Sequence, residues 1–417
     1  MHEFKYRHNQ LYCENLKIED IANQIGTPLY IYSHKTLINH YFKLKRAFAR
    51  INPLICFSVK ANSNLTILKS LVQQGAGLDI VSGGELFRAL KVGCPPQKIV
   101  YASVGKTGQE IKSAIKAGIL FFNVESLPEL ENINRIAGEL GKKARVAIRV
   151  NPDVSASTHK FITTGKITNK FGIDFKAAYN ILERRRDFDC LDISGIHVHI
   201  GSQITKAVPF IKAITRVSQF LARLKKTGIR LEYFNIGGGL GIVYNQEIPQ
   251  TALNFAKQTL PLLKKSRMRI ILEPGRFIVG NAGIFVTKVL YVKNTLRKKF
   301  VIVDGAMNDL IRPSLYEAYH KIIPLKAGSR GTEKYDVVGP ICESGDSFAK
   351  ARIMPKVGQG DFLAIMGCGA YGFSMSSNYN SRLRVAEVMV AKNKACLIRK
   401  RDTCQDLIRN EIIINNF

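Results

Sequence analysis

The chain has 417 residues, of which 46% are hydrophobic and 23% are charged. This composition is typical of a globular protein and excludes a disordered chain, while the length exceeds one ordinary core, so we expect two domains. The formal net charge of +30 would suit a surface that binds polyanions. However, the basic residues are scattered and no nucleic-acid-binding motif accompanies them, so we do not expect a nucleic-acid partner.

The eight cysteines include no Cys-x-x-Cys pair. Their spacing suits neither a zinc site nor a disulfide framework, so we expect free thiols and no metal. Residues 1–5 contain no apolar signal region, and no stretch approaches the roughly 18 apolar residues of a membrane span. These features predict a cytoplasmic protein with no membrane partner.

The N-terminal residues predict a small mixed segment. Residues 5–11 and 16–18 are expected to form short strands, followed by a small helix from Asp20. Residues 28–32 predict a further strand, and Ser33 would cap the helix that follows it.

From residue 54 onward, short apolar runs alternate with helical patterns. The predicted strands are residues 54–59, 78–81, 99–101, 120–124, 144–150, 193–200, 231–236 and 269–272. The predicted helices between them include residues 65–73, 107–117, 126–140, 175–183, 208–226 and 252–263. Such near-equal units favour an α/β fold of the (β/α)8 TIM-like barrel type over a doubly wound open sheet, and we place this barrel in residues 26–273.

After Pro274 the pattern changes to strands joined by turns. Strands are predicted at residues 285–292, 300–303, 335–338, 361–365 and 383–390, with a short helix near residues 315–320. These strands predict a mostly antiparallel β-domain. The strands before residue 25 have no partner in the barrel, so we expect the β-domain to combine residues 1–25 and 274–417.

Polar side chains recur where the barrel strands end, which is where chemistry collects in barrels of this kind. Lys60 follows the first apolar run, and Asp79 lies within the next. Burial would lower the pKa of the lysine, and a neutral amine can attack a carbonyl group. The alternative is a solvated lysine at the end of a strand.

A glycine run follows a later strand and precedes a helical pattern. Gly237, Gly238 and Gly239 would let backbone N–H groups surround a phosphate, although a tight turn explains the run equally well when it is taken alone. Ser202 and Arg276 are placed to add donors, and the arginine fork suits a phosphate. One wall of the barrel mouth is therefore predicted to bind phosphate.

Two histidines and a carboxylate stand at the same end of the barrel. Strand alternation points His197 and His199 to one side, where either is a core histidine or a ring that stacks on a ligand. Glu273 would hold a pyridine nitrogen protonated, or else pair with Arg276. Together with Lys60 and the phosphate site, these groups describe a pyridoxal 5′-phosphate site. A sugar-phosphate aldolase or isomerase barrel is the alternative, but it would not need the β-domain.

The β-domain carries polar clusters of its own. Arg312 and Tyr316 stand four residues apart, and in a helical turn both would face a carboxylate; an ordinary surface turn is the alternative. Cys342 lies beside Glu343 between glycines, as inert packing or as an exposed acid. A third glycine-framed loop presents Tyr371.

Eight separated motifs occur in one order along the chain, at residues 57–62, 79–85, 197–202, 237–241, 273–276, 308–316, 342–346 and 369–373. With these motifs the chain resembles the fold-type III, alanine-racemase-like pyridoxal-phosphate enzymes. Within them it is similar to the diaminopimelate decarboxylase family, over about residues 28–390.

The resemblance implies which residues hold the cofactor. Lys60 carries pyridoxal 5′-phosphate, His199 stacks on its ring, and Glu273 pairs with the ring nitrogen. The phosphate is bound by Ser202, Gly237, Gly238, Gly239 and Arg276. The remaining cofactor contacts are Asp79, Pro274, Gly275 and Tyr371.

The resemblance also implies a reaction, the decarboxylation of meso-2,6-diaminopimelate to L-lysine and CO2. The substrate contacts are Arg276, Arg312, Tyr316, Glu343 and Tyr371. Cys342 supplies the proton that replaces the lost carboxylate, and it reaches the site with Glu343 from the other subunit of a homodimer with shared active sites. A decarboxylase of ornithine, arginine or carboxynorspermidine, an amino-acid racemase and a non-catalytic homologue remain alternatives.

Overall fold

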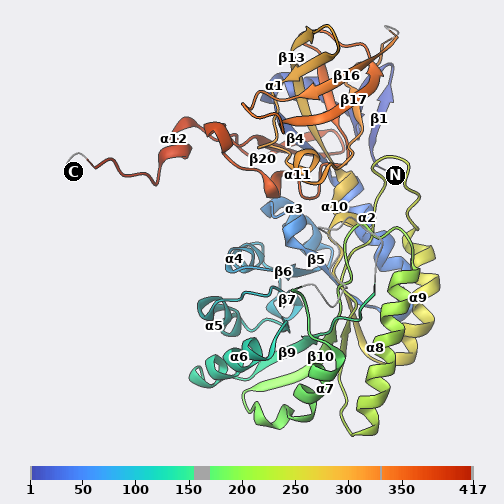
Figure 1. The fold of residues 1–417 in the computed structure, drawn as a ribbon, viewed down its shortest axis with the longest axis vertical. Helices are drawn as coiled ribbons and strands as arrows, with labels where there is room; N and C mark the ends of the chain where they lie inside the picture. Colours follow the sequence, from blue (N-terminus) through green and yellow to red (C-terminus); the bar gives the residue numbers. More distant parts are fainter. Residues whose placement is uncertain (1, 155–169, 329–330, 415–417) are drawn as a thin grey trace. The chain divides into compact units, whose positions relative to one another are not determined.

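The computed structural model describes residues 2–154, 170–328 and 331–414 (Figure 1). The chain divides into two compact units. The β-rich unit contains Met1–Leu37, Val243–Gln246 and Val279–Phe417, and the barrel unit contains Ile38–Ile242 and Glu247–Ile278. Among the described residues, no helix has the length and apolar character needed to cross a membrane.

The barrel unit is built on parallel strands that close on themselves. Within the described residues the order around the barrel is β10-β11-β12-β5-β6-β7-β8-β9. The strands are β5 (Leu54–Ser58), β6 (Gly77–Ile80), β7 (Ile99–Tyr101), β8 (Phe121–Val124), β9 (Ala144–Arg149), β10 (Leu191–His197), β11 (Tyr233–Asn235) and β12 (Arg269–Leu272). Closure through the β12–β5 pair confirms the predicted barrel and excludes the open sheet.

Helices alternate with these strands and lie on their outer side (Figure 1). They are α2 (His34–Ala47), α3 (Leu65–Gln73), α4 (Gly83–Lys91), α5 (Gly108–Ala117), α6 (Leu127–Glu139), α7 (Phe175–Glu183), α8 (Val208–Lys226) and α9 (Ala252–Ser266). A short helix, α10 (Arg276–Val279), follows the last barrel strand. Ser82, Thr107 and Ser126 each accept a hydrogen bond from the backbone N–H three residues later. These side chains satisfy a donor that the first helical turn leaves open, which explains where α4, α5 and α6 begin.

Side chains fill the barrel, so it is a packed core rather than a pore. One buried cluster contains Cys56, Val100, Leu120, Phe121, Ala147, Tyr233 and Ile271. The side chains of Phe121 and Tyr233 meet edge to face, with ring centroids 5.7 Å apart. Burial of this apolar surface fixes the positions of the strand ends that carry the polar side chains described below.

The β-rich unit is a nine-stranded, mostly antiparallel sheet within the described residues. Its main path is β17-β16-β14-β13-β4-β19-β20, with β18 pairing β13 and β15. The strands are β4 (Leu29–Ser33), β13 (Gly283–Asn294), β14 (Lys299–Val303), β15 (Ile322–Pro324), β16 (Thr332–Val338), β17 (Ser347–Pro355), β18 (Phe362–Ile365), β19 (Ala386–Ala391) and β20 (Lys394–Arg399). A small sheet of β1 (Phe4–Arg7), β2 (Gln10–Cys13) and β3 (Leu16–Lys17), with helices α1 (Ile18–Ile25), α11 (Arg312–Tyr316) and α12 (Cys404–Ile408), completes the unit.

The division of the chain differs from the predicted boundary at residue 25. Strand β4, which the sequence placed with the barrel, pairs with β13 and β19 in the centre of the large sheet. All five of its residues are buried, because it is covered on both faces. The N-terminal part of the β-rich unit therefore reaches Leu37.

Three further differences between the predicted and the observed elements have local causes. Strands β15, β17 and β20 were not predicted, because β15 is short and the other two interrupt their apolar residues with lysine and arginine. The predicted helix near residues 315–320 is α11, which ends at Tyr316 because Glu317 takes a left-handed conformation. Strand β10 ends at His197 rather than at residue 200.

Candidate active site

Lys60 lies in a short 3-10 turn, Val59–Ala61, directly after β5. Its Nζ atom is 3.1 Å from Oδ2 of Asp79, which is fully buried on β6. Ser58 Oγ donates to the same oxygen at 2.7 Å, while Oδ1 of Asp79 has no hydrogen-bond partner among the described residues. Burial raises the pKa of Asp79, and the nearby Glu273 carboxylate adds to this. Lys60 is thus ion-paired with a buried acid, while its own side chain is 37% exposed.

Glu273, directly after β12, is buried and held by three side chains. Asn123 Nδ2 on β8 and Asn235 Nδ2 on β11 donate to Oε1 at 3.1 and 2.5 Å. His197 Nε2 lies 3.2 Å from Oε2. Burial would raise the pKa of Glu273, but His197, the charge of Lys60 and the Asn235 hydrogen bond hold it well below its ordinary range. The site therefore keeps an ionised carboxylate in a dry environment.

Asn123 and Asn235 had not been predicted as part of the site. Each is a single polar residue within an apolar strand, Phe121–Val124 or Tyr233–Asn235, and each is fully buried. A buried amide in such a run must find a hydrogen-bond partner inside the protein. A lone amide in an apolar strand could have indicated these two residues, but the sequence did not show that both amides converge on one carboxylate.

The glycine run after β11 lies in close contact with the neighbouring strand ends. A Cβ on Gly238 would lie 2.0 Å from the carbonyl oxygen of Glu273, and Gly239 has a φ of +106°, so neither position accepts another residue without strain. Arg276 Nη2 donates to Ser202 Oγ at 3.1 Å, and both residues belong to this barrel unit. The helix predicted after the run, residues 252–263, is α9, which begins at Ala252.

His199 is attached to the glycine run by a hydrogen bond. The N–H of Gly238 donates to Nδ1 of His199 at 3.2 Å. Burial, followed by the charges of Arg149 and Lys60, lowers the pKa of His199 well below its ordinary value. The imidazole is therefore neutral, which suits a ring that stacks on an aromatic cofactor.

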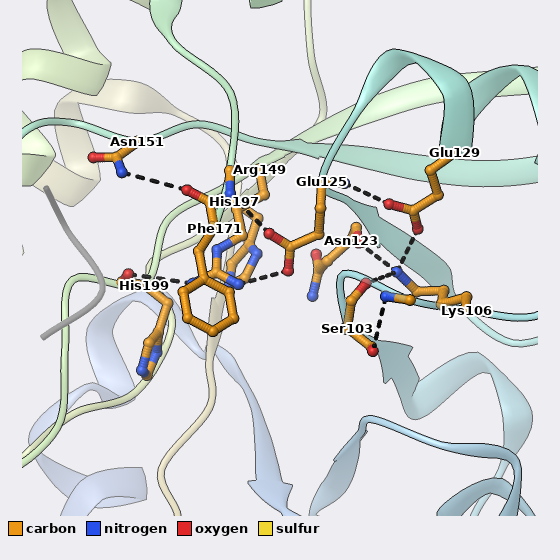
Figure 2. Close-up of polar contacts among 12 residues, drawn as sticks. Ser103, Lys106, Asn123, Glu125, Glu129, Arg149, Asn151, Phe171, His197 and His199 are labelled. Atoms are coloured by element: carbon orange, nitrogen blue, oxygen red, sulfur yellow. Dashed lines mark hydrogen bonds and ion pairs between the residues drawn. The ribbon is translucent and has the colours of Figure 1, made fainter. Parts of the chain in front are cut away.

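A set of buried ion pairs lies next to Asn123 and His197 (Figure 2). Arg149 Nη1 is 2.6 Å from Glu125 Oε1, and Lys106 Nζ is 2.5 Å from Glu129 Oε1. Lys106 also donates to the carbonyl oxygen of Asn123 at 2.9 Å, and Arg149 Nη2 lies 3.5 Å from that of His199. The network thus fixes the backbone on which two site residues stand. Sequence reasoning did not identify it, because its members come from the segment after β7, the segment after β8, α6 and the end of β9.

In the β-rich unit, α11 provides the helical turn predicted for Arg312 and Tyr316. Arg312 is buried, and its Nη1 atom lies 2.8 Å from Nε2 of His320. The centre of its guanidinium is 4.8 Å from the centroid of the Tyr244 ring. The arginine is therefore held by contacts on its edge and on its face.

The loop that carries Cys342 and Glu343 presents both side chains to solvent in the single chain. Tyr379 donates from its hydroxyl group to Oε2 of Glu343 at 2.9 Å, a partner that sequence reasoning missed. Asp346 shapes the loop by accepting the N–H of Ile341 at 2.7 Å. Tyr371 is half-buried, with a positive φ of 57°. The exposure of the Cys342 thiol agrees with the alternative in which this residue is an exposed acid, and not with the alternative in which it is inert packing.

Comparisons with known proteins define the class of enzyme to which this chain belongs. The family model for the pyridoxal-binding domain of pyridoxal-dependent decarboxylases matches residues 34–280. These residues contain Lys60, Asp79, Glu273 and the glycine run. The protein is therefore a pyridoxal-phosphate-dependent decarboxylase, a lyase.

Individual relatives define the family more narrowly. A diaminopimelate decarboxylase of Vibrio cholerae is 47% identical over 99% of this chain and 100% of its own length. One of Aquifex aeolicus is 47% identical over 98% of this chain and 97% of its own. The crystal structure of the Helicobacter pylori diaminopimelate decarboxylase complexed with L-lysine superposes with a TM-score of 0.91, at 42% identity, over 95% of this chain and 99% of its own. The chain belongs to the diaminopimelate decarboxylase family.

The described residues fit pyridoxal 5′-phosphate. The glycine run leaves no room for a Cβ, as expected where backbone N–H groups approach a phosphate closely. The acid at Glu273 is ionised and buried, and the unpartnered Oδ1 of Asp79 lies on the residue that holds Lys60. A phosphate cradle, an amine, a neutral ring and a carboxylate are together the groups that this cofactor requires.

We expect Gly238→Ala to weaken binding of pyridoxal 5′-phosphate roughly 10- to 100-fold, because the new methyl group displaces the Glu273 backbone. Titration of the cofactor-free protein, followed by visible absorbance, measures this. Gly84→Ala is the matched control, since its Cβ would meet nothing closer than Ser82 Oγ at 3.8 Å. Equal affinities of the two variants would contradict a cradle role for Gly238.

Proposed function

We infer that the protein converts meso-2,6-diaminopimelate to L-lysine and CO2, the last step of lysine biosynthesis. The observation that carries the inference is end-to-end similarity to diaminopimelate decarboxylases, which covers the barrel unit and the β-rich unit alike. The bound product in the Helicobacter pylori relative supports the same reaction. In the present protein all eight cysteines lie within the described residues and are free thiols, which supports a cytoplasmic setting.

The barrel residues would hold the cofactor. Lys60 attaches it, and Asp79 orients the lysine amine. His199 packs against the ring, and Glu273 keeps a proton on the ring nitrogen because its own pKa stays low. The bound cofactor supplies an electron sink for the electron pair left when the carboxylate departs. The phosphate contacts are assigned to Ser202, Gly237, Gly238, Gly239 and Arg276, and the other cofactor contacts to Pro274, Gly275 and Tyr371.

The residues of the β-rich unit would select the substrate. Arg312 carries a fixed positive charge that suits the distal carboxylate of diaminopimelate, with Tyr316 on the same helical turn. Glu343 suits the distal ammonium group. Arg276 and Tyr371 complete the proposed substrate contacts. A decarboxylase of ornithine or arginine would have no distal carboxylate for Arg312 to bind.

Cys342 would donate the proton that replaces the lost carboxylate, and we assign it to the site of a second copy of the chain. Its side chain is exposed in the single chain, as is Glu343. A proton donor works in a site that excludes water, so an exposed donor needs a covering partner. A homodimer with two shared sites meets this requirement and the symmetry common among oligomers.

Mixing two inactive variants tests the shared site. Lys60→Ala and Cys342→Ala chains, unfolded and refolded together in equal amounts, are expected to regain about a quarter of wild-type turnover, because half of the dimers are mixed and each mixed dimer holds one intact site. Either variant refolded alone is the control. Absence of recovery, when sedimentation shows mixed dimers, would contradict sharing.

The reaction itself is tested by substrate comparison. The protein loaded with pyridoxal phosphate should release CO2 and L-lysine from meso-diaminopimelate, and should do so faster than it releases CO2 from ornithine, arginine or carboxynorspermidine. Faster turnover of ornithine or arginine would overturn the proposed substrate. Exchange of the α-proton without release of CO2 would indicate a racemase instead.

A further inference from the structure

His320 occupies a fixed place beside Arg312 in the β-rich unit. It lies just before β15, and Met366 lies just after β18, the strand that pairs with β15. The N–H of Met366 donates to the carbonyl oxygen of Lys321 at 2.8 Å, so the strand pairing continues to this point. His320 is completely buried. The backbone directly after His320 is therefore held by the pairing of β15 with β18.

The two nitrogen atoms of His320 have partners that determine where its proton lies. Nδ1 is 2.8 Å from the carbonyl oxygen of Met366, which can only accept, so Nδ1 carries the hydrogen. Nε2 is 2.8 Å from Nη1 of Arg312, which can only donate, so Nε2 accepts. Both hydrogen bonds are made together only by the neutral imidazole with its hydrogen on Nδ1.

Two further groups that contact the ring within the described residues, a thiol and an aromatic ring, carry no charge. Cys368 Sγ lies 3.6 Å from Nδ1, and burial raises the pKa of this thiol so that it stays protonated. Tyr244 meets the imidazole edge to face, with centroids 5.2 Å apart, and the same tyrosine ring lies against the Arg312 guanidinium. Arg352 donates to the backbone oxygen of His320 at 2.9 Å, away from the ring.

This arrangement orients a buried arginine by means of a neutral acceptor. A carboxylate in the place of His320 would also orient the guanidinium, but it would neutralise the charge and compete with a substrate carboxylate. Neither an imidazole acceptor nor an aromatic face carries a negative charge that would neutralise the guanidinium. The planar guanidinium group has the fork geometry that binds a carboxylate through two hydrogen bonds.

We propose that His320 is a positioning residue that aims the Arg312 guanidinium at the distal carboxylate of the substrate, and that it thereby contributes to the selection of a carboxylate-bearing amino acid. This proposal rests on the role proposed above for Arg312. It assigns no contact between His320 and the substrate, since the imidazole acts through the arginine.

The test compares two ligands on the protein loaded with pyridoxal phosphate. L-lysine has the carboxylate in question, and 1,5-diaminopentane is the same molecule without it. Binding of each is followed by the change in visible absorbance, and KM and kcat for meso-diaminopimelate are measured in parallel. The variants are Arg312→Ala, His320→Asn and His320→Gln, with thermal unfolding to verify that each folds.

The two histidine variants form a matched pair. Glutamine places an amide oxygen near Nε2 and keeps an acceptor for Arg312, whereas asparagine occupies the Nδ1 side and leaves Arg312 without that acceptor. We expect His320→Asn to weaken L-lysine binding and raise KM roughly 10-fold, with kcat and diaminopentane binding changed less than about 3-fold. His320→Gln should restore L-lysine binding to within about 3-fold of the wild type, and Arg312→Ala should weaken it about 100-fold.

The outcomes distinguish the substrate-binding role of Arg312 from the positioning role of His320. If Arg312→Ala leaves L-lysine binding unchanged, the role proposed for Arg312 is wrong and the role of His320 is overturned with it. If Arg312→Ala weakens binding but His320→Asn does not, only the positioning role is overturned. Equal loss for both ligands, a fall in kcat alone, or identical behaviour of the asparagine and glutamine variants would also overturn it.

Discussion

Replacing Lys60 by alanine is expected to abolish the visible absorbance band of lysine-bound pyridoxal phosphate and to lower kcat by roughly 10⁴- to 10⁶-fold, the range for loss of a group that reacts covalently. The lysine is the amine nearest the buried acid Asp79, with 3.1 Å between Nζ and Oδ2. Its loss removes the point of covalent attachment and leaves the Asp79 carboxylate without its cation. Absorbance spectra and the rate of CO2 release measure the two effects.

Lys60→Arg is the matched control for this result, because it keeps a cation beside Asp79 but offers no amine that can attach the cofactor. We expect it to fold with wild-type stability and to be as inactive as the alanine variant. Addition of a small primary amine should restore part of the turnover of Lys60→Ala and none of that of Lys60→Arg, which fills the space. Substantial activity in either variant without added amine would show that another residue attaches the cofactor.

Replacing Glu273 by glutamine is expected to lower kcat about 10³-fold while leaving the visible absorbance band present, since Lys60 remains. Glutamine still accepts from Asn123 and Asn235 through its amide oxygen, but it carries no charge to hold a proton on the cofactor nitrogen. Its amide nitrogen also faces Nε2 of His197, where the wild-type carboxylate accepts. The separation of absorbance from turnover distinguishes this defect from that of Lys60→Ala.

The pH dependence follows from the low pKa of Glu273. In the folded protein this pKa lies below the ordinary value of about 4.3, so the carboxylate contributes stability above that pH and loses it only as the pH falls through the lower folded value. The glutamine variant should lack this contribution to the free energy of unfolding.

Glu232→Gln is the control for the loss of turnover, since the Glu232 carboxylate is 46% exposed in a surface ion pair with Arg269. A loss of turnover of similar size in the control would contradict the assignment.

The barrel could be predicted from the sequence because its strands are short apolar runs between helices with clear end signals. The bounds of β7 and β12, and of α7 and α8, agree with the sequence patterns. The sheet of the other unit was harder to predict, because its pairing joins strands far apart in the chain. Strand β4 lies between β13 and β19, about 250 or more residues away, and no local pattern indicates such a partner.

Part of the site was predictable because several of its residues stand at the ends of the barrel strands. Lys60, the glycine run and Glu273 each stand at the end of a strand, and a barrel brings all strand ends to one mouth. The groups that hold them were not predictable in this way. Asn123, Asn235 and His197 converge on one carboxylate from three strands. The pairing of β15 with β18 brings the ring of His320, which contacts Arg312, to the carbonyl oxygen of Met366.

The sequence by itself determined which chemical groups this protein has at its strand ends, because residue type and spacing are local properties. It also determined the barrel class, since eight alternating units leave few ways to bury their apolar faces. Only the tertiary structure decided the charge and protonation of these groups. The ionised Glu273, the neutral His199 and the Nδ1–H form of His320 follow from partners that are distant in sequence, which the fold brings within hydrogen-bonding distance in a buried environment.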